Sequence, residues 1–494
     1  MDFKINKIDP PQRGYTRHIT ISASLILSVA IILLLLSGIA KALSSIDFSV
    51  FLSLAGANLQ TDSYGHTNFL LLGTGGENHD GGDLTDTIIV ASLDQKSKLV
   101  TLVSIPRDLY LDDKKIGGSR INMVYYNAKN YFGSSAKGLE YLKSKVETTL
   151  GIPIHYWIKI DFAGFKDLVD ALGGIDVDVK EAIVDPFYPK GETVFYETFS
   201  ISTGPHHLDG DTALKYARSR ETTSDFSRSD RQQQIIYAIK EQALKANVIL
   251  SRDKIENLFN AVKNNVETNL QIKEMLTIGL SAKNFSSDQI VQRLVHDDPS
   301  RCGGFLYTPD RELYEGAFVL IPAGTPDQMQ KYFDLNFNFP EVAHSETKIH
   351  VLNSTPRGGV AAETKQILRR MCFDINRFGN GRSKDIQKTT YFYKESENKT
   401  RPIALDFLKK IIPGVESTEI PEEYLEYIDD TDIILELGTD YVNSPNYLED
   451  EFYYLPVIPK EEETAATSDT TTAETPPSPE NVDGLYFTHA HNPA

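Results

Sequence analysis

The sequence is poor in cysteine and short of positive charge. Its only cysteines, Cys302 and Cys372, are too few for a disulfide framework or a cysteine-based zinc site. They could pair with each other, but their segments fall in different predicted domains, so we favour two free thiols over one bond. The formal net charge of −19 argues against a nucleic-acid binder, which usually shows a basic footprint. An acidic chain can still hold a local basic pocket for an anionic substrate.

Two nucleotide-binding signatures are absent as well. The chain has neither a G-x-G-x-x-G fingerprint nor a Walker A motif. Glycines nevertheless gather after an apolar segment, at Gly73, Gly75, Gly76, Gly81 and Gly82. Because glycine has no Cβ, this loop allows the backbone to approach a ligand closely.

Charge is also missing along one stretch near the N-terminus. No residue from Ile19 to Ala40 is charged, and a helix of this length, at about 1.5 Å per residue, spans a hydrocarbon core of roughly 30 Å. We therefore predict a transmembrane helix at residues 19–40. A cleaved signal peptide, cut near Ala40-Lys41-Ala42, is the alternative, but its apolar region usually runs only about 7–15 residues.

The flanking charges predict the orientation of this helix. Four basic residues precede it: Lys4, Lys7, Arg13 and Arg17. By the positive-inside rule, residues 1–18 stay in the cytoplasm. Residues 41–66 then form a juxtamembrane stretch, and the rest of the chain lies outside the cell membrane.

The rest of the chain alternates β-branched segments with helical spacing, which predicts a layered α/β fold. It divides into a larger domain at residues 67–341, with its core motifs at 68–246, and a smaller α/β domain at 346–445. Residues 459–494 are rich in Glu, Thr, Pro and Ala and predict a disordered tail. In the larger domain we expect strands at 68–72, 87–93, 99–105, 154–160 and 175–179, and helices at 139–150, 161–172 and 229–246.

An arginine and an aspartate, Arg107 and Asp108, directly follow one of these strands. Ligand sites in α/β proteins lie beyond the carboxyl ends of strands, and the planar guanidinium suits a diphosphate. A surface turn is the alternative for the pair alone.

More arginines follow in separate regions of this acidic chain. Arg218 and Arg220 alternate in a segment that we read as extended, so both would lie on one face. Further arginines flank them: Arg120 after a Gly-Gly-Ser turn, and Arg228 and Arg231 near a predicted helix N-terminus, where an anion is favoured. A solvated face of ion pairs is the alternative to a phosphate pocket.

An aspartate, Asp86, stands at the start of the second strand. Mg²⁺ binds through one or two carboxylates plus phosphate oxygens, so Asp86 is a candidate metal ligand. A capping or turn aspartate is the alternative.

Seven segments in order from Asn68 to Gln234 resemble the LytR-CpsA-Psr family of cell-wall glycopolymer ligases. They read NFLLLGT, LTDTIIVASLD, VSIPRDLY, RIN, VDALGGIDVDV, LDGDTALKYARSR and DFSRSDRQQQ. The region from Lys348 to about Val442 is similar to the LytR-type C-terminal domain of some family members. It carries IHVLNST, a GGVAA turn and ILELGTDY.

The resemblance implies a single-pass membrane protein with a three-layer α/β/α catalytic domain outside the cell. It implies a polyprenyl pyrophosphate held by Mg²⁺ and by side chains at Arg107, Arg120, Arg218, Arg220, Arg228 and Gln232. Asp86 matches a metal-binding aspartate, and Asp108 and Asp225 match acidic positions of the family motifs.

The chain departs from the family pattern twice. Gly75 stands where the family usually has an aspartate, and Leu84 stands where it usually has an arginine. Nearby His79, Asp80 and Asp83 can compensate, and we take Asp80 as the candidate second metal ligand, with Glu77 as its rival.

The expected reaction moves a glycopolymer from a polyprenyl-pyrophosphate carrier onto a cell-envelope acceptor such as peptidoglycan, with Mg²⁺ as cofactor and no nucleic acid as partner. Arg107 would stabilise the transferring phosphoryl group, and Asp108 or Asp225 would accept the proton of the attacking hydroxyl. Two alternatives stay open: a polyprenyl-pyrophosphate pyrophosphatase, and a non-catalytic protein that binds lipid-linked polymers in the envelope.

Overall fold

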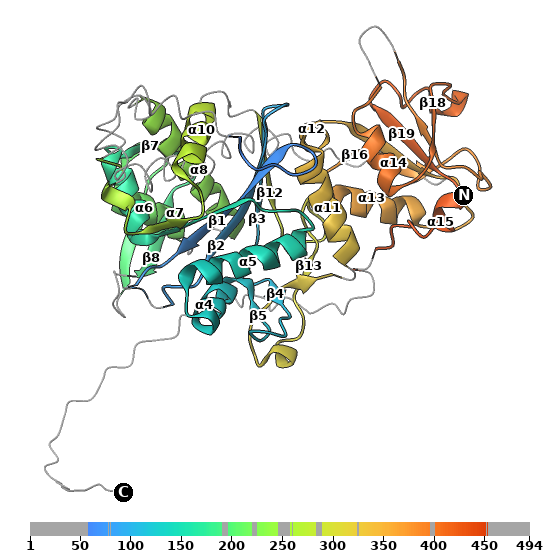
Figure 1. Ribbon diagram of the computed structural model, residues 1–494. Helices are drawn as coiled ribbons and strands as arrows, with labels where there is room; N and C mark the ends of the chain where they lie inside the picture. Colours follow the sequence, from blue (N-terminus) through green and yellow to red (C-terminus); the bar gives the residue numbers. More distant parts are fainter. Residues whose placement is uncertain are drawn as a thin grey trace, which may run out of the picture. The chain divides into compact units, whose positions relative to one another are not determined.

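The structure is a computed structural model of all 494 residues (Figure 1). The residues that it describes are 58–77, 79, 81–189, 196–219, 225–245, 257–258, 260–282, 289–323, 326–395, 401–450 and 452. In this part of the chain, no helix is long and apolar enough to cross a membrane. The predicted transmembrane helix at 19–40 and the predicted tail at 459–494 lie outside the described residues, so both stay predictions.

The first sheet has six strands in the order β11-β6-β1-β2-β3-β12. Its strands are β1 (His66–Thr74), β2 (Thr87–Asp94), β3 (Leu99–Ser104), β6 (Tyr156–Asp161), β11 (Val266–Thr268) and β12 (Ile290–Leu294). β2 runs antiparallel to β1 and β3, whereas β6 is parallel to β1 and β12 is parallel to β3. The sheet is therefore mixed, and β1 lies near its centre.

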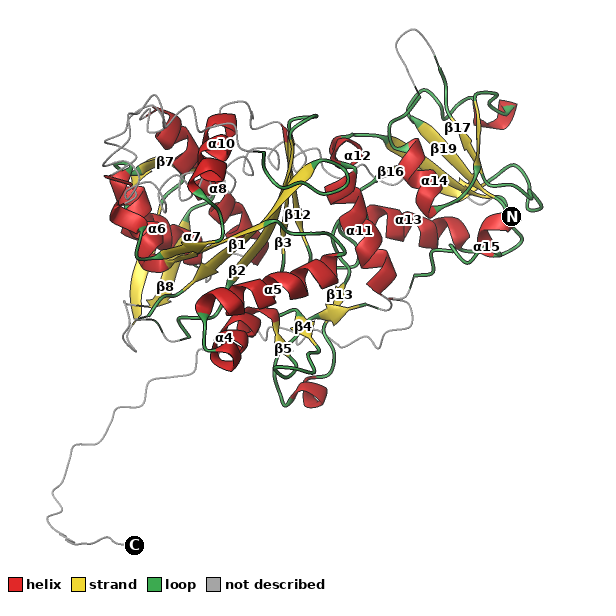
Figure 2. Ribbon diagram, in the orientation of Figure 1, coloured by secondary structure: helices red, strands yellow, loops and turns green. Residues whose placement is uncertain are grey.

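Both faces of this sheet are buried. Alternate residues of β1 point to opposite faces, so Phe69 and Leu71 enter one apolar cluster and Leu70 and Leu72 enter another. Helices cover both faces (Figure 2). The first cluster contains residues of α6 (Phe162–Ala171), α7 (Gly210–Arg218), α8 (Asp225–Lys245) and α10 (Ile272–Ala282), and the second contains residues of α4 (Ile121–Phe132) and α5 (Ser135–Leu150). The mixed α/β fold that the sequence predicts is confirmed.

Local sequence signals explain where these helices begin and end. Asp161 accepts a hydrogen bond from the backbone N–H of Gly164 and so caps the start of α6, as predicted. Gly151 ends α5 in the left-handed region at φ 73°, where glycine pays no steric penalty.

Short strands and helices surround the sheet. Two-stranded pairs are formed by β4 (Tyr110–Leu111) with β5 (Ser119–Arg120), by β7 (Ile175–Val179) with β10 (Gly204–Leu208), by β8 (Ile183–Pro189) with β9 (Tyr196–Ile201), and by β13 (Leu306–Tyr307) with β14 (Ile321–Pro322). The remaining elements before residue 346 are η4 (Arg311–Tyr314), α11 (Pro326–Asn338) and α12 (Pro340–His344). The β4–β5 and β8–β9 pairs carry side chains of the site described below.

The second sheet has five strands in the order β16-β15-β19-β17-β18. Its elements in chain order are β15 (Lys348–Asn353), α13 (Val360–Arg370), β16 (Asp374–Asn380), β17 (Thr390–Phe392), α14 (Leu405–Ile411), β18 (Val415–Ser417), η5 (Glu422–Tyr424), β19 (Ile433–Leu437) and α15 (Thr439–Val442). β15 is parallel to its neighbours β16 and β19, and β17 is parallel to β18, whereas the pairing of β17 with β19 is antiparallel. This segment is thus a small α/β sheet of its own.

The two cysteines are bonded to each other, with 4.6 Å between the Cα atoms of Cys302 and Cys372. Our preference for two free thiols is therefore wrong. The bond joins the segment after β12 to Cys372, two residues after the end of α13, and the N–H of Gly303 donates to the carbonyl of Arg370 beside it. No local sequence pattern predicts this bond, because the two cysteines are 70 positions apart in sequence.

Candidate functional site

Predicted site residues from several segments lie at one edge of the first sheet. Because β2 runs antiparallel to its neighbours, β2 begins at the edge where β1, β3 and β6 end. In register, Gly73 pairs with Thr87 and Thr74 pairs with Asp161. The glycine-rich loop, the segment after β3 and the start of α6 therefore meet at this edge.

Arg107 and Asp86 form an ion pair there. Nη1 of Arg107 donates to Oδ1 of Asp86 at 3.2 Å, and Nδ2 of Asn122 donates to the same oxygen at 3.2 Å. The side chain of Asp86 stays partly exposed, and Asn122, in the first turn of α4, is buried. Segments that are 21 and 36 residues from Asp86 in sequence are thus brought to one carboxylate.

Asp108 extends this chain of charges. It lies 3.5 Å from Nε of Arg107 and accepts from Nη1 of Arg120 at 3.1 Å. Backbone contacts position Arg120 and Asp108. Arg120 pairs with Tyr110 across β4–β5, and the carbonyl of Asp108 accepts from the N–H of Leu320. The predicted residues Asp86, Arg107, Asp108 and Arg120 therefore lie in one continuous network.

Arg218 occupies a separate part of the same edge. It is the last residue of α7, so our reading of this segment as extended is wrong at Arg218. Its guanidinium stacks 4.2 Å from the ring centre of Phe162 and reaches the hydroxyl of Tyr188 at 3.4 Å and Nε2 of His79 at 3.2 Å. Burial raises the pKa of Tyr188, and the charge of Arg218 opposes that rise.

The other predicted site residues are only partly described. Asp80 and Arg220 lie outside the described residues. The backbone of α8 contains Asp225, Arg228 and Gln232, whose side chains also lie outside the description. Their placement in the site stays a prediction.

Arg231, which the sequence placed near the start of α8, has a structural contact. It is buried, and its guanidinium donates to the carbonyl of Ser219, directly after α7. The hydroxyl of Ser219 in turn donates to the buried carboxylate of Asp185 on β8 at 2.7 Å. These contacts tie α7, α8 and β8 together behind Arg218.

The first departure from the family pattern has a physical counterpart. A Cβ added at Gly75 would lie 2.8 Å from Cβ, Cγ and Nδ1 of His79. The ring of His79 also stands edge-on to Phe162, with 5.2 Å between ring centres. His79 thus fills the space beside the missing side chain.

The second departure leaves an apolar residue in the loop. The side chain of Leu84 lies close to Gly81, where an added Cβ would be 2.8 Å from Cδ1 of Leu84. Next to it, Asp83 accepts from Nζ of Lys129 on α4 at 2.6 Å, and this bond raises the pKa of Lys129. A cation from α4 is therefore present near the position where the family arginine is absent.

Oxygen donors at Asp86 fit a hard cation such as Mg²⁺. The contacts of Arg107 and Asn122 both use Oδ1 of Asp86. Oδ1 of Asn122 is buried and has no hydrogen-bond partner among the described residues. Those residues contain no group of three His, Cys, Asp or Glu that could hold a metal, so phosphate oxygens of a substrate would have to complete the shell.

Sequence reasoning missed the contacts of four side chains at this edge: Asn122, Phe162, Tyr188 and His79. Asn122 belongs to the R-I-N motif, which signalled the site without giving its partner. Phe162 and Tyr188 gave no signal, because their contacts with Arg218 span 56 and 30 residues of chain. Only the packed structure brings them together.

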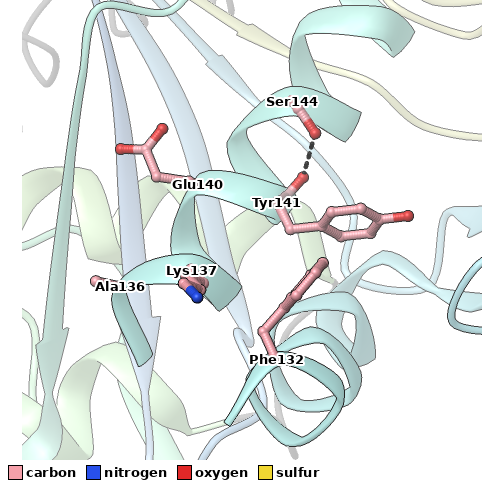
Figure 3. A pocket seen from close by; sticks show the side chains of 6 residues that line it. All are labelled: Phe132, Ala136, Lys137, Glu140, Tyr141 and Ser144. Carbon is pink, nitrogen blue, oxygen red and sulfur yellow. Dashed lines mark hydrogen bonds between the residues drawn. The ribbon is translucent and has the colours of Figure 1, made fainter. Parts of the chain in front are cut away.

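An open depression of about 420 Å³ lies elsewhere, between α4 and α5 (Figure 3). Its lining residues are Phe132, Ala136, Lys137, Glu140, Tyr141 and Ser144. None of the predicted site residues lines it, so we do not assign it to the site.

Fold and site together define a mixed α/β protein with paired arginines and aspartates at one edge of its main sheet. The chain belongs to the LytR_cpsA_psr family, whose model matches residues 45–315. A second family model, described as LytR cell envelope-related transcriptional attenuator, matches residues 346–441.

Curated relatives match about half of this chain. The polyisoprenyl-teichoic acid–peptidoglycan teichoic acid transferase TagV of Bacillus subtilis is 34% identical over 47% of this chain, and the match spans only 54% of TagV. The corresponding TagU of Bacillus licheniformis is 32% identical over 50% of this chain and 73% of TagU. The crystal structure of B. subtilis TagV matches 55% of this chain and 97% of that chain, with 28% identity and a TM-score of 0.42.

Proposed function

We propose that this protein transfers a glycopolymer from a polyprenyl-pyrophosphate carrier onto a cell-envelope acceptor, peptidoglycan or a similar polymer. The observation that carries the proposal is the network of Asp86, Arg107, Asp108 and Arg120 at the sheet edge. Relatives that match about half of the chain are named teichoic acid transferases.

The arginines suit a diphosphate because each presents a planar set of donors. Arg107 and Arg120 both contact Asp108, and both guanidinium groups stay partly exposed. A diphosphate can therefore replace the carboxylate of Asp108 as their partner. Arg218 would contact the same anion from the α7 side, and Arg220, Arg228 and Gln232 complete the proposed set. Phosphoryl transfer depends mostly on positioning and electrostatic stabilisation, which such a set supplies.

Asp108 has two candidate roles. Its contacts with both arginines hold them in place, and its carboxylate is an acceptor for the proton of an attacking hydroxyl. Asp225 is the rival for the second role. Bond formation between the acceptor oxygen and the polymer-bearing phosphorus would release polyprenyl monophosphate.

Mg²⁺ would sit at Asp86, with the amide oxygen of Asn122 and an acid of the loop, Asp80, as further candidates. Bound there, the ion would neutralise charge on the diphosphate. We further propose that the apolar run at 19–40 anchors the chain in the cell membrane with the catalytic domain outside.

Product analysis tests the proposed reaction. The full-length chain is incubated with a lipid-linked oligosaccharide diphosphate and peptidoglycan, and the products are separated. A covalent conjugate with polyprenyl monophosphate supports the proposal. Inorganic phosphate without conjugate favours the pyrophosphatase alternative, and bound but unchanged substrate favours the non-catalytic one.

The metal assignment has its own test. Asp86→Asn removes a charged oxygen ligand, so it should raise the Mg²⁺ concentration needed for half-maximal turnover. Asp80→Asn should have a smaller effect. If EDTA leaves the wild-type activity intact, the magnesium assignment is wrong.

A further inference from the structure

The geometry points to His79 as a positioning residue that holds the guanidinium of Arg218 in the orientation needed for the diphosphate. This inference rests on the proposed function, because it assumes that Arg218 contacts that anion. It adds a residue that the family pattern does not predict, since the loop position that usually carries an aspartate is Gly75 here.

Among the described residues, three side chains contact Arg218, and one of these, His79, reaches it from the glycine-rich loop. Phe162 offers a ring face at 4.2 Å, and Tyr188 offers a hydroxyl at 3.4 Å. His79 offers a ring nitrogen at 3.2 Å from Nη2. An arginine has no acceptor, so Nε2 of His79 must accept this bond, and the ring carries its proton on Nδ1.

The stacking contact and the hydrogen bond constrain different motions. The ring of Phe162 fixes the plane of the guanidinium but allows it to rotate within that plane. The directional bond from Nη2 to His79, at 3.2 Å shorter than the 3.4 Å bond from Nη1 to Tyr188, contributes most to stopping this rotation, because a hydrogen bond weakens steeply as its angle falls. Together they leave the remaining donors of Arg218 in one defined direction.

The absence of a side chain at position 75 makes this arrangement possible. A Cβ at Gly75 would lie 2.8 Å from three atoms of His79, a distance that real Cβ atoms essentially never show. An aspartate at position 75 and the ring of His79 therefore exclude each other in this conformation. The lack of a side chain at Gly75 therefore leaves the space that His79 needs to contact Arg218.

The test compares two substitutions of His79 in the full-length chain. His79→Gln keeps an acceptor at similar reach, whereas His79→Phe keeps a ring against Phe162 but has no acceptor. Binding of inorganic pyrophosphate is measured by calorimetry. Since a hydrogen bond to a charged group contributes at least a factor of about ten, we expect His79→Phe to weaken binding by about tenfold or more and His79→Gln by less than about threefold.

A double-mutant cycle separates positioning from general damage. In an Arg218→Ala background, His79→Phe should cause no further loss, because its partner is already gone. An equal loss from His79→Phe in both backgrounds would overturn the inference. Normal pyrophosphate binding in His79→Phe, together with weak binding in Arg218→Ala, would overturn it while leaving the arginine site intact.

Gly75→Ala provides a second route that leaves both partners in the sequence. The added methyl should displace the ring, so this variant should bind pyrophosphate as weakly as His79→Phe, with a thermal melt that confirms a folded protein. Wild-type affinity in Gly75→Ala would also count against the inference. If neither Arg218→Ala nor Arg107→Ala weakens binding, the proposed function itself fails.

Discussion

The two sheets of this chain use charged side chains in different ways. At the edge of the first sheet, Arg107 and Arg120 keep 27% and 35% of their side chains exposed, and Asp86 keeps 41%. In the second region, Arg370 keeps 3% and Glu436 none. Partly exposed charges can exchange partners with an anionic ligand, whereas buried, saturated charges cannot do so without unfolding their surroundings. The first edge is therefore the candidate for chemistry.

In the second region, the charged side chains of Arg370 and Glu436 bind other groups of the protein. Arg370 makes two hydrogen bonds to Asp450, at 2.8 and 3.0 Å, and a third to the carbonyl of Pro299 at 2.8 Å. Glu436 accepts from Ser354 at 2.7 Å and from Tyr424 at 2.5 Å. Buried charges with such partners fix a conformation, and loss of one partner leaves the other unpaired.

The largest effect should come from Arg107→Ala. Loss of a guanidinium that stabilises phosphoryl charge should lower the transfer rate by about 2–4 kcal/mol, or roughly 30- to 1000-fold, with little change in thermal stability. Arg357→Ala is the matched control, since Arg357 is a partly exposed, ion-paired arginine of the second region. Transfer rates are measured with a lipid-linked donor, and near-normal turnover in folded Arg107→Ala would sink the mechanism.

Arg370→Ala should show the reverse pattern. Removal of this buried partner should lower the free energy of unfolding by about 3 kcal/mol, because the carboxylate of Asp450 loses its two bonds. Urea unfolding gives this value, and turnover per folded molecule should stay normal. A change below about 0.5 kcal/mol, as for an ordinary surface site, would contradict the contrast between the regions.

Replacing both cysteines should have a somewhat smaller effect on stability. The bond restrains a long loop of the unfolded chain, so Cys302→Ser with Cys372→Ser should cost about 2 kcal/mol, at the low end for disulfides because other contacts hold the same junction. A reducing agent should lower the melting temperature of the wild type and leave the double variant unchanged. Equal sensitivity of both proteins to the reducing agent would argue against the bond.

The smallest expected effect is a change in the stability of the protein at low pH. The ion pair with Arg401, aided by Lys409, lowers the pKa of Glu416 from 4.5 to about 2. The folded pKa is below the unfolded one, so the contribution is fully present above pH 4.5 and is lost as pH falls toward 2. Because solvent screens this pair, we expect about 1 kcal/mol, seen as a weaker acid destabilisation in Glu416→Gln than in the wild type. Identical profiles of the two proteins between these limits would refute the assignment.

Much of the first sheet could be predicted because its signals are local. Strand patterns at 68–72, 87–93 and 99–105 lie within β1 and β2 and overlap β3, and the capping roles of Gly151 and Asp161 are confirmed. Each of these sequence signals depends only on residues that are close to one another along the chain. β12 was missed because residues 281–346 carry no clear alternation and the strand gains its place only from β3.

The site was predictable in its residues but not in its contacts. The sequence singled out Arg107 and Asp108 after a strand and Asp86 at the start of another, but not the ion pairs that join them. The segment around Arg218 was misread because alternating charges favour a strand, whereas Asp209 caps a short helix that ends at Arg218. The contact between Arg218 and His79 spans 139 residues, and no local pattern encodes it.

The bond between Cys302 and Cys372 also determines what happens when the backbone between the two cysteines is cut. It closes a covalent ring that contains β15, α13 and the connection from the first sheet. A protease cut within this ring would leave two fragments that migrate as one species until a thiol is added. A chain shortened after Glu341 would instead leave Cys302 unpaired, so it would gain a reactive thiol and a tendency to form crosslinked dimers. Any assay of the isolated first domain therefore needs a serine at position 302, or it would measure that dimer.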